Sequence, residues 1–327
     1  MNVRDELREK AAKLGRTVIL PEGGDERTIK AALILKKEGI AEPVIVGTVN
    51  SVKDAAKGAD ISSLRIIYPE DFGDRDIFIK EHAGKRALKG VSFETAKEEI
   101  MNELNFGAML LKKGYGDIAV AGAVNTTADV LRAGLRILGT KEGIRTVSSF
   151  FLMILPNGKF GKNGALFFAD CAVIPDPTPE QLADIASATA ENAKKLLDLE
   201  PRVAFLSFST KGSAVTSHTE KIVNAVNILK NRTPGFLFDG EMQADAALVE
   251  EVGLKKAKGS PVAGKANVLI FPDLNSGNIG YKLVQRLAGA MAFGPILQGF
   301  SKPLCDLSRG CSAEDIVDTA AVCALMS

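Results

Sequence analysis

A hydroxyl, a guanidinium and a glycine stand in a row near the C-terminus, in the segment Ser308-Arg309-Gly310. Directly after it, Ser312 is a good helix N-cap, Asp315 completes a capping box, and an apolar run follows from 316 to 325. The free N–H groups of a helix start favour an anion, and a guanidinium fork matches phosphate or carboxylate. The pattern therefore predicts an anion site with a hydroxyl beside it and a carboxylate in the first turn of a helix.

A purely structural interpretation of the same residues is also open. Asp315 could do no more than cap the helix, and Arg309 could be a solvated surface charge, because short motifs give many false matches. Cys311, next to the predicted helix start, is a rival nucleophile, since thiol pKa values fall at such positions. Spacing alone does not choose among these alternatives.

Composition excludes several classes of protein. The 327 residues are 46% hydrophobic and 25% charged with a net charge of +1, which fits a globular protein and argues against nucleic-acid binding. The charged N-terminus does not resemble a secretory signal, and the apolar runs are too short to span a membrane. Four cysteines without a C-x-x-C pair argue against a zinc site or a disulfide framework. We therefore expect a cytoplasmic protein that binds neither nucleic acid nor membrane.

Apolar runs alternate with amphipathic stretches along most of the chain, which indicates mainly parallel sheets covered by helices. One long helix is predicted from Ser92 to Lys113. Two apolar runs, 147–155 and 165–173, flank the turn Pro156-Asn157-Gly158 and predict an antiparallel hairpin. We expect two α/β domains, the first formed by 1–144 plus 296–327 and the second by 145–295.

Polar segments that follow strands are candidates for ligand contacts, because ligands bind at the carboxyl ends of strands in open α/β sheets. Asn275 and Asn278 are such candidates, and a helix is predicted to begin at about Asn278. The segment 259–266 nearly matches a nucleotide P-loop, but it lacks the final Ser or Thr and precedes a strand, so we interpret it as a turn. The two histidines, His82 and His218, are expected to be solvated helix residues.

The stretch 306–312, followed by Glu314-Asp315-Ile316-Val317, resembles the C-terminal signature of phosphate acetyltransferases (phosphotransacetylases) of the phosphate acetyl/butyryltransferase family. Four further segments resemble that family in the same order along the chain: 21–27, 207–213, 239–247 and 271–278. Together they cover nearly the whole sequence and are far more specific than any one motif. The resemblance implies a fold like that of isocitrate and isopropylmalate dehydrogenases, with the active site in a cleft between the domains.

The resemblance also implies the chemistry, in which acetyl-CoA and phosphate give acetyl phosphate and CoA by direct transfer in a ternary complex. Ser308 would hydrogen-bond the CoA sulfur or the tetrahedral intermediate, Arg309 would stabilise the oxyanion, and Asp315 would take the thiol proton. Substrate binding is expected from a further set: Arg86, Arg132, Thr127, Asn275, Asn278 and Gly310. CoA is a substrate here, no cofactor or metal is expected, monovalent cations could stimulate activity, and a homodimer is implied.

Three alternatives stay open on the sequence. A phosphate butyryltransferase would share the chemistry and differ only in its acyl pocket. A metal- and NAD-dependent dehydrogenase of similar fold would need an aspartate cluster and a nicotinamide loop, and neither is found. A regulatory copy without activity is disfavoured by the intact Ser308, Arg309 and Asp315.

Overall fold

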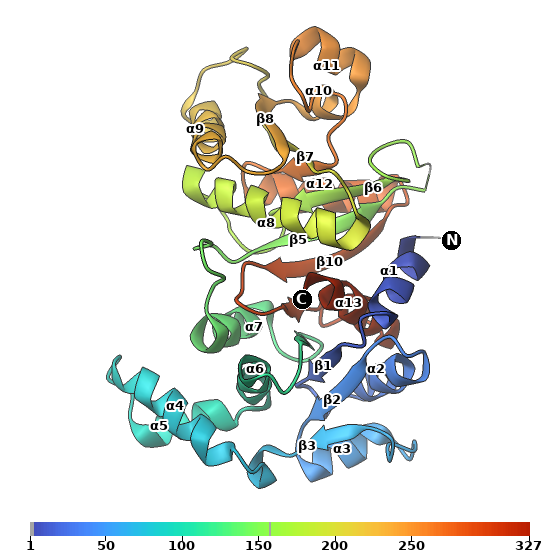
Figure 1. Cartoon of the computed structure of the whole chain (residues 1–327), viewed down its shortest axis with the longest axis vertical. Helices are drawn as coiled ribbons and strands as arrows, with labels where there is room; N and C mark the ends of the chain where they lie inside the picture. The colour runs from blue at the N-terminus through green and yellow to red at the C-terminus, as the bar shows by residue number, and fades with distance from the viewer. Residues whose placement is uncertain (1–2, 157) are drawn as a thin grey trace. The chain divides into compact units, whose positions relative to one another are not determined.

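The computed structural model describes residues 3–156 and 158–327 (Figure 1), so Asn157 of the predicted turn lies outside the described residues. Two compact units divide the chain, one of residues up to 141 together with 300–327, and one of residues 142–299. The sequence placed these divisions at 144/145 and 295/296. No helix in the described ranges is both long and apolar enough to cross a lipid bilayer.

The first unit is built on a five-stranded sheet with the order β11-β4-β1-β2-β3, in which every pairing is parallel. Its strands are β1 (Thr17–Leu20), β2 (Glu42–Val46), β3 (Arg65–Ile67), β4 (Ile118–Ala121) and β11 (Leu304–Asp306). Its helices are α1 (Val3–Ala12), α2 (Glu26–Lys37), α3 (Val49–Ala56), α4 (Arg75–Ala87), α5 (Phe93–Met101), α6 (Glu103–Lys113), α7 (Thr127–Ala133) and α13 (Ala313–Met326), with a short 3₁₀ turn at Pro69–Asp71 and a π-helical turn at Gly134–Leu138. Buried strand residues such as Ile19 and Ile45 explain the apolar runs that predicted this sheet.

The long helix predicted from Ser92 to Lys113 is wrong, because Asn102 breaks it. The backbone of Asn102 is extended (φ −60°, ψ 132°), and this ends α5. Its side-chain oxygen accepts hydrogen bonds from the N–H groups of Leu104 (3.1 Å) and Asn105 (3.4 Å) and so caps α6. Two helices meet where periodicity alone indicated one.

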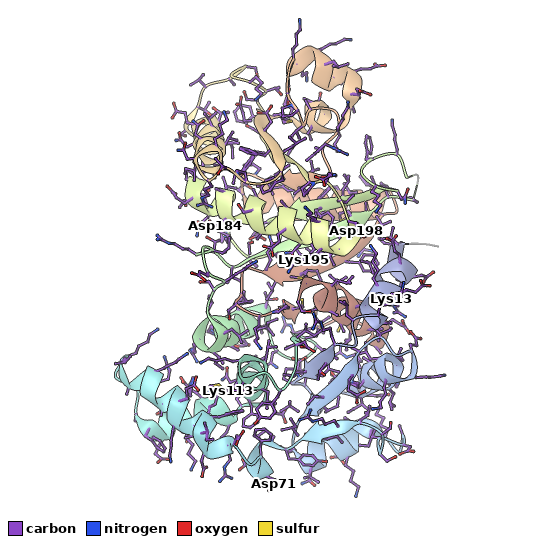
Figure 2. The ribbon with its side chains drawn as sticks, viewed as in Figure 1. Lys13, Asp71, Lys113, Asp184, Lys195 and Asp198 are labelled. Carbon is purple, nitrogen blue, oxygen red and sulfur yellow. The ribbon has the colours of Figure 1, made fainter. Side chains whose placement is uncertain are left out.

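The second unit has a six-stranded mixed sheet with the order β10-β5-β6-β9-β7-β8. Its strands are β5 (Ser148–Ile154), β6 (Ala165–Ala169), β7 (Arg202–Leu206), β8 (Leu237–Met242), β9 (Val268–Ile270) and β10 (Met291–Gln298), and its helices are α8 (Pro179–Leu197), α9 (Ser217–Asn231), α10 (Ala244–Leu248), α11 (Glu250–Lys256) and α12 (Leu274–Leu287). The antiparallel pairing of β5 with β6 confirms the predicted hairpin. On α8, the buried Asp184 (labelled in Figure 2) accepts a hydrogen bond from Thr146 and forms an ion pair with Arg232.

Helix α12 begins earlier than predicted. Asp273 is its N-cap and accepts a hydrogen bond from the N–H of Ser276 at 2.9 Å. Asn275 and Asn278 therefore lie in the first two turns of the helix and not in a loop before it. The segment 259–266 forms turns ahead of β9, as the sequence predicted.

Candidate active site

The site lies at one edge of the first unit's sheet. Strands β11, β4 and β1 are parallel neighbours, so the segments that follow them meet at the same edge. These segments carry Glu22 after β1, the loop 122–126 after β4, and the loop 307–312 after β11. We call the last of these the signature loop.

The signature loop presents its polar residues to solvent, since Ser308, Arg309 and Gly310 are all exposed. The Gly310 N–H donates to the Ser308 hydroxyl at 3.3 Å. Beyond the loop, Ser312 caps α13, and the Oδ2 atom of Asp315 accepts from the N–H and the hydroxyl of Ser312, both at 2.8 Å. The predicted capping box is thus confirmed. The box uses only the Oδ2 atom of Asp315, and the residue is exposed to solvent.

Arg27, which the sequence reasoning missed, fastens the signature loop to its neighbours. Its guanidinium donates to the carbonyl oxygens of Arg309 (2.8 Å), Cys311 (2.9 Å) and Ala123 (2.8 Å). Asp25 lies against the same guanidinium, and hydrogen bonds from Arg27 hold the pKa of Asp25 below its usual range. The Arg309 guanidinium, in contrast, is exposed and has no hydrogen-bond or ion-pair partner in the part of the chain that the structure describes, so its donors remain available to a ligand.

Glu22 is a second residue that sequence reasoning missed. Its side chain is 5% exposed, and its carboxylate accepts hydrogen bonds from four consecutive backbone N–H groups, those of residues 122–125. The side-chain amide of Asn125 adds another at 2.8 Å. The β4–α7 loop is therefore folded around one carboxylate. An acidic residue two positions after the end of a buried strand was the signal that could have indicated it.

Thr127, one of the predicted site residues, is the first residue of α7 and bonds the residue that precedes the signature loop. Its hydroxyl donates to Oδ2 of Asp306 at 2.6 Å, and Asp306 is 1% exposed. The other oxygen, Oδ1, is buried without a partner among the described residues. Burial raises the pKa of Asp306 to about 6, and the charge of Glu22 adds to this effect. The Thr127 hydroxyl is therefore oriented by a buried carboxyl group whose pKa is raised by its burial.

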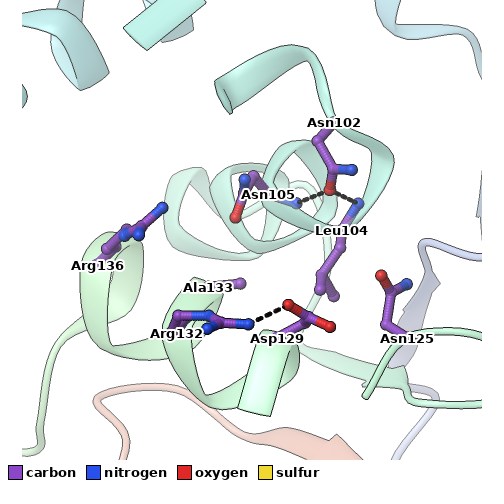
Figure 3. A pocket seen from close by; sticks show the side chains of 8 residues that line it. All are labelled: Asn102, Leu104, Asn105, Asn125, Asp129, Arg132, Ala133 and Arg136. Carbon is purple, nitrogen blue, oxygen red and sulfur yellow. Dashed lines mark hydrogen bonds and ion pairs between the residues drawn. The ribbon is translucent and has the colours of Figure 1, made fainter. Parts of the chain in front are cut away.

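A pocket of about 210 Å³ opens elsewhere in this unit, near the starts of α6 and α7 (Figure 3). Arg132 and Arg136 line it, together with Asn102, Leu104, Asn105, Asn125, Asp129 and Ala133. The Arg132 side chain is 59% exposed and forms an ion pair with Asp129. The predicted residue Arg132 is therefore placed where it can contact a ligand, and Asn125 connects the pocket to the Glu22 loop.

Arg86 has a different environment from Arg132. Its Nε and Nη2 donate to the two oxygens of Glu99 at 2.7 and 2.8 Å, and Nη1 of Arg136 lies 3.5 Å from the same carboxylate. The Nε2 atom of His82 is 2.9 Å from Glu99. Burial alone would raise the pKa of Glu99, but the hydrogen bonds from Arg86 and His82 outweigh it and hold that pKa below its usual range.

The expectation that His82 is solvated is wrong, because its side chain is 2% exposed. It packs on the inner face of α4, where Phe78 and Ile79 are also buried. His218 at the start of α9 is exposed, as expected. Sequence reasoning missed Glu99 because no local pattern marks it as the partner of Arg86, which lies 13 positions earlier on a different helix.

The two remaining site candidates belong to the second unit. The Asn278 amide donates to the carbonyl oxygen of Cys171 at 3.1 Å, which fixes α12 to the end of β6. Asn275 is exposed in the first turn of α12. Of the two, Asn275 is exposed to solvent, and Asn278 has a structural hydrogen bond.

The cysteines do not favour a thiol nucleophile. Burial raises the pKa of the Cys311 thiol, and the lowering effect of Arg27 does not offset it. Burial also raises the pKa values of Cys171 and Cys305 well above the ordinary range. A thiol that stays protonated at neutral pH is a poor nucleophile.

Comparison with known proteins gives concordant results. The family model described as phosphate acetyl/butaryl transferase matches residues 2–324. The phosphate acetyltransferase of Thermoanaerobacterium thermosaccharolyticum is 51% identical over 327 residues, which is 100% of both chains. That of Bacillus subtilis is 41% identical, with 97% of each chain covered.

Solved structures agree with the sequence matches. A phosphotransacetylase from Streptococcus pyogenes superposes with a TM-score of 0.92 at 43% identity, covering 99% of this chain and 97% of that one. A putative 4-hydroxythreonine-4-phosphate dehydrogenase from Salmonella typhimurium gives 0.56 at 12% identity, covering 95% and 99%. The second likeness concerns the fold alone, and it confirms the predicted dehydrogenase-like class of two α/β domains.

Proposed function

Because this chain belongs to the phosphate acetyl/butaryl transferase family, we propose that it transfers an acetyl group reversibly between coenzyme A and inorganic phosphate. The observation that carries the proposal is 51% identity over the full length to a phosphate acetyltransferase, combined with an exposed Ser308-Arg309 pair at the strand ends. In the direction of thioester synthesis, the sulfur of CoA attacks the carbonyl carbon of acetyl phosphate. The carbon–oxygen bond to phosphate then breaks, and phosphate leaves with the electron pair.

Arg309 is the residue placed to stabilise the charge that develops in this reaction. Its guanidinium makes no hydrogen bond or ion pair within the described ranges, whereas its backbone carbonyl accepts a hydrogen bond from Arg27 at 2.8 Å. A guanidinium with unpaired N–H donors on a fixed backbone suits an oxyanion or a phosphoryl group, because donors that are already in position need little rearrangement when the charge develops. Ser308, one residue earlier, is proposed to hydrogen-bond the sulfur, and the Gly310 N–H leaves its hydroxyl proton free to donate.

We assign the thiol proton to Asp315. A thiol has a pKa of about 8.5 and an ordinary aspartate about 3.9, so this transfer is uphill by roughly 6 kcal/mol. The Oδ2 atom of Asp315 holds the helix cap, which leaves Oδ1 to face the ligand. The carboxylate alone does not overcome such a gap, so the guanidinium of Arg309 must stabilise the thiolate as it forms.

The remaining candidates are proposed to bind substrate. Arg132 and Arg86 would act on the phosphates of CoA, and Thr127 and Gly310 would contact the reacting groups near the signature loop. Asn275 and Asn278, on α12, are likewise proposed to bind substrate. We further propose a cytoplasmic homodimer that needs no metal or cofactor and responds to monovalent cations.

The acyl preference is tested by measuring thioester formation from CoA with acetyl phosphate and, in parallel, with butyryl phosphate, without added metal or nicotinamide. Relatives at 41–51% identity are phosphate acetyltransferases, so we expect fast turnover with the acetyl donor and little with the butyryl donor. Preference for butyryl phosphate would keep the mechanism and replace the substrate. Absence of thioester from both donors would refute the proposed function.

A further inference from the structure

Three lysines gather around one carboxylate on helices α4 and α6, outside the candidate active site. Glu81 and Lys85 lie one turn apart on α4, and Lys112 and Lys113 are the last two residues of α6. We propose that Lys85 is a modification site, at which acetyl phosphate transfers its acetyl group to the lysine amine. The inference goes beyond the proposed function, because it concerns a side chain that takes no part in the transfer between CoA and phosphate.

The first argument is that the carboxylate nearest to Lys85 along the helix is already occupied. Glu81 forms ion pairs with Lys112 through Oε1 and with Lys113 through Oε2. Hydrogen bonds from Lys112 and then Lys113 lower the pKa of Glu81 to about 2. A lysine four positions after a glutamate is its usual partner on a helix, but here both carboxylate oxygens are engaged by α6. Lys85 forms no ion pair among the residues that the structure describes.

The second argument is a hydrogen bond between two amino groups, those of Lys85 and Lys112. A lysine ammonium has three donors and no acceptor, so this bond requires one of the two groups to be a neutral amine. Burial alone would lower the pKa of Lys112, but its hydrogen bonds with Glu81 and Lys85 outweigh burial and raise that pKa. The neutral amine is therefore that of Lys85, whose pKa is lowered by the bond to Lys112, by burial and by the charge of Lys112.

The third argument is that this amine is both reactive and accessible. A lysine next to another cationic group becomes a nucleophile near neutral pH, because its lone pair is not taken up by a proton. Lys85 is exposed on α4, so an acyl donor in solution can reach it. With Lys85 neutral, the ammonium groups of Lys112 and Lys113 still outnumber the single carboxylate of Glu81. The cluster therefore attracts an anionic donor such as acetyl phosphate.

The reaction needs no further reagent. The nitrogen of Lys85 attacks the carbonyl carbon of acetyl phosphate and forms a carbon–nitrogen bond. The carbon–oxygen bond to phosphate breaks, phosphate leaves with the electron pair, and the proton from nitrogen passes to phosphate or water. The product is an uncharged amide. Its carbonyl oxygen can accept the hydrogen bond that Lys112 donated to the amine, so the cluster accommodates the acetyl group.

The test incubates the full-length protein with acetyl phosphate near neutral pH, without CoA, and follows each acetylated lysine over time by mass spectrometry. Lys97, which is also exposed and lies on the adjoining helix α5, is the internal reference. We expect Lys85 to be acetylated at least about fivefold faster than Lys97. Equal rates at the two lysines would overturn the inference. Because acetyl phosphate is added directly, a protein that makes no thioester would refute the proposed function and still decide this inference.

Lys112→Gln separates the effect of the neighbouring charge from that of exposure. The substitution removes the ammonium group beside Lys85 and frees one oxygen of Glu81, so acetylation of Lys85 should slow to the rate of Lys97. Lys53→Gln, at an exposed position on α3, is the matched control and should leave the rate at Lys85 unchanged. An unchanged rate at Lys85 in Lys112→Gln would overturn the inference. If that variant does not fold, the comparison of the two lysines in the wild-type protein decides.

Discussion

Replacing Glu22 by Gln tests whether one buried carboxylate organises the candidate site. In the structure, Oε2 is the acceptor for the Ala123 N–H at 2.8 Å, and Oε1 accepts from the N–H groups of Val124 and Asn125. A glutamine can put its oxygen at only one of these positions. With the oxygen in place of Oε1, the amide NH₂ would face the Ala123 N–H, and two donors would point at each other.

The magnitude follows from these contacts. One buried N–H without an acceptor costs about 1–3 kcal/mol, and the remaining bonds to Glu22 weaken because they lose a charged acceptor. Removing a buried charge recovers part of that cost. We therefore expect Glu22→Gln to lower the free energy of unfolding by about 3 kcal/mol. Because Ala123 also binds Arg27, the signature loop should shift and the kcat should fall.

Urea unfolding followed by circular dichroism, together with acetyl-CoA synthesis, measures both effects. Glu251→Gln is the matched control, since Glu251 is exposed on α11 of the second unit, and it should change neither quantity. Asn125→Ala removes only one donor and should cost about 1 kcal/mol. A loss below about 1 kcal/mol in Glu22→Gln, with wild-type kcat, would refute the reasoning.

Three further predictions concern the strand ends and the signature loop. Asp306 has its pKa raised from 3.8 to about 6, so the folded state holds a proton that the unfolded chain releases. The free energy of unfolding should therefore fall by up to about 3 kcal/mol as the pH rises from 4 to 6. Urea titrations at several pH values should show a weaker dependence of stability on pH in Asp306→Asn. Gly122→Ala should lower the Tm sharply and abolish activity, because the residue has φ +107° and an added Cβ would lie 2.3 Å from Oδ1 of Asp306; a Tm near that of the wild type would contradict the assigned backbone. Asp315→Asn should reduce kcat at least tenfold. Ser312→Ala, which removes the helix cap, should cost about 1 kcal/mol of stability and reduce kcat much less. Equal losses of kcat in the two variants would show that Asp315 matters only through the cap.

Patterns confined to a few neighbouring residues were predicted correctly. The capping box of Ser312 and Asp315 spans three positions, and the β5–β6 hairpin joins segments that are adjacent in the chain. The strand order could not be read in this way, but the family resemblance supplied the two-domain class. The break at Asn102 escaped because apolar spacing continues across it, although asparagine followed by a glutamate is a helix-start signal.

The same contrast between local patterns and long-range contacts applies to the candidate site. Ser308, Arg309 and Asp315 lie within one short segment of the sequence and could be identified together, but the residues that hold this segment in place are remote. Glu22 binds a loop 100 positions away, and Arg27 reaches the carbonyl oxygen of Arg309 across 282 positions.

The sequence by itself determined the helix cap, the Ser308-Arg309-Gly310 pattern that predicts an anion site, and the family. Only the tertiary structure decided that Arg86 pairs with Glu99, that Arg136 lines a pocket, and that Thr127 bonds Asp306 across 179 positions. The physical reason is that capping satisfies backbone groups within one helical turn, whereas these partners meet only when the sheet order brings distant strand ends and helices together. Burial then sets the pKa of Asp306, and burial is a property of the folded chain.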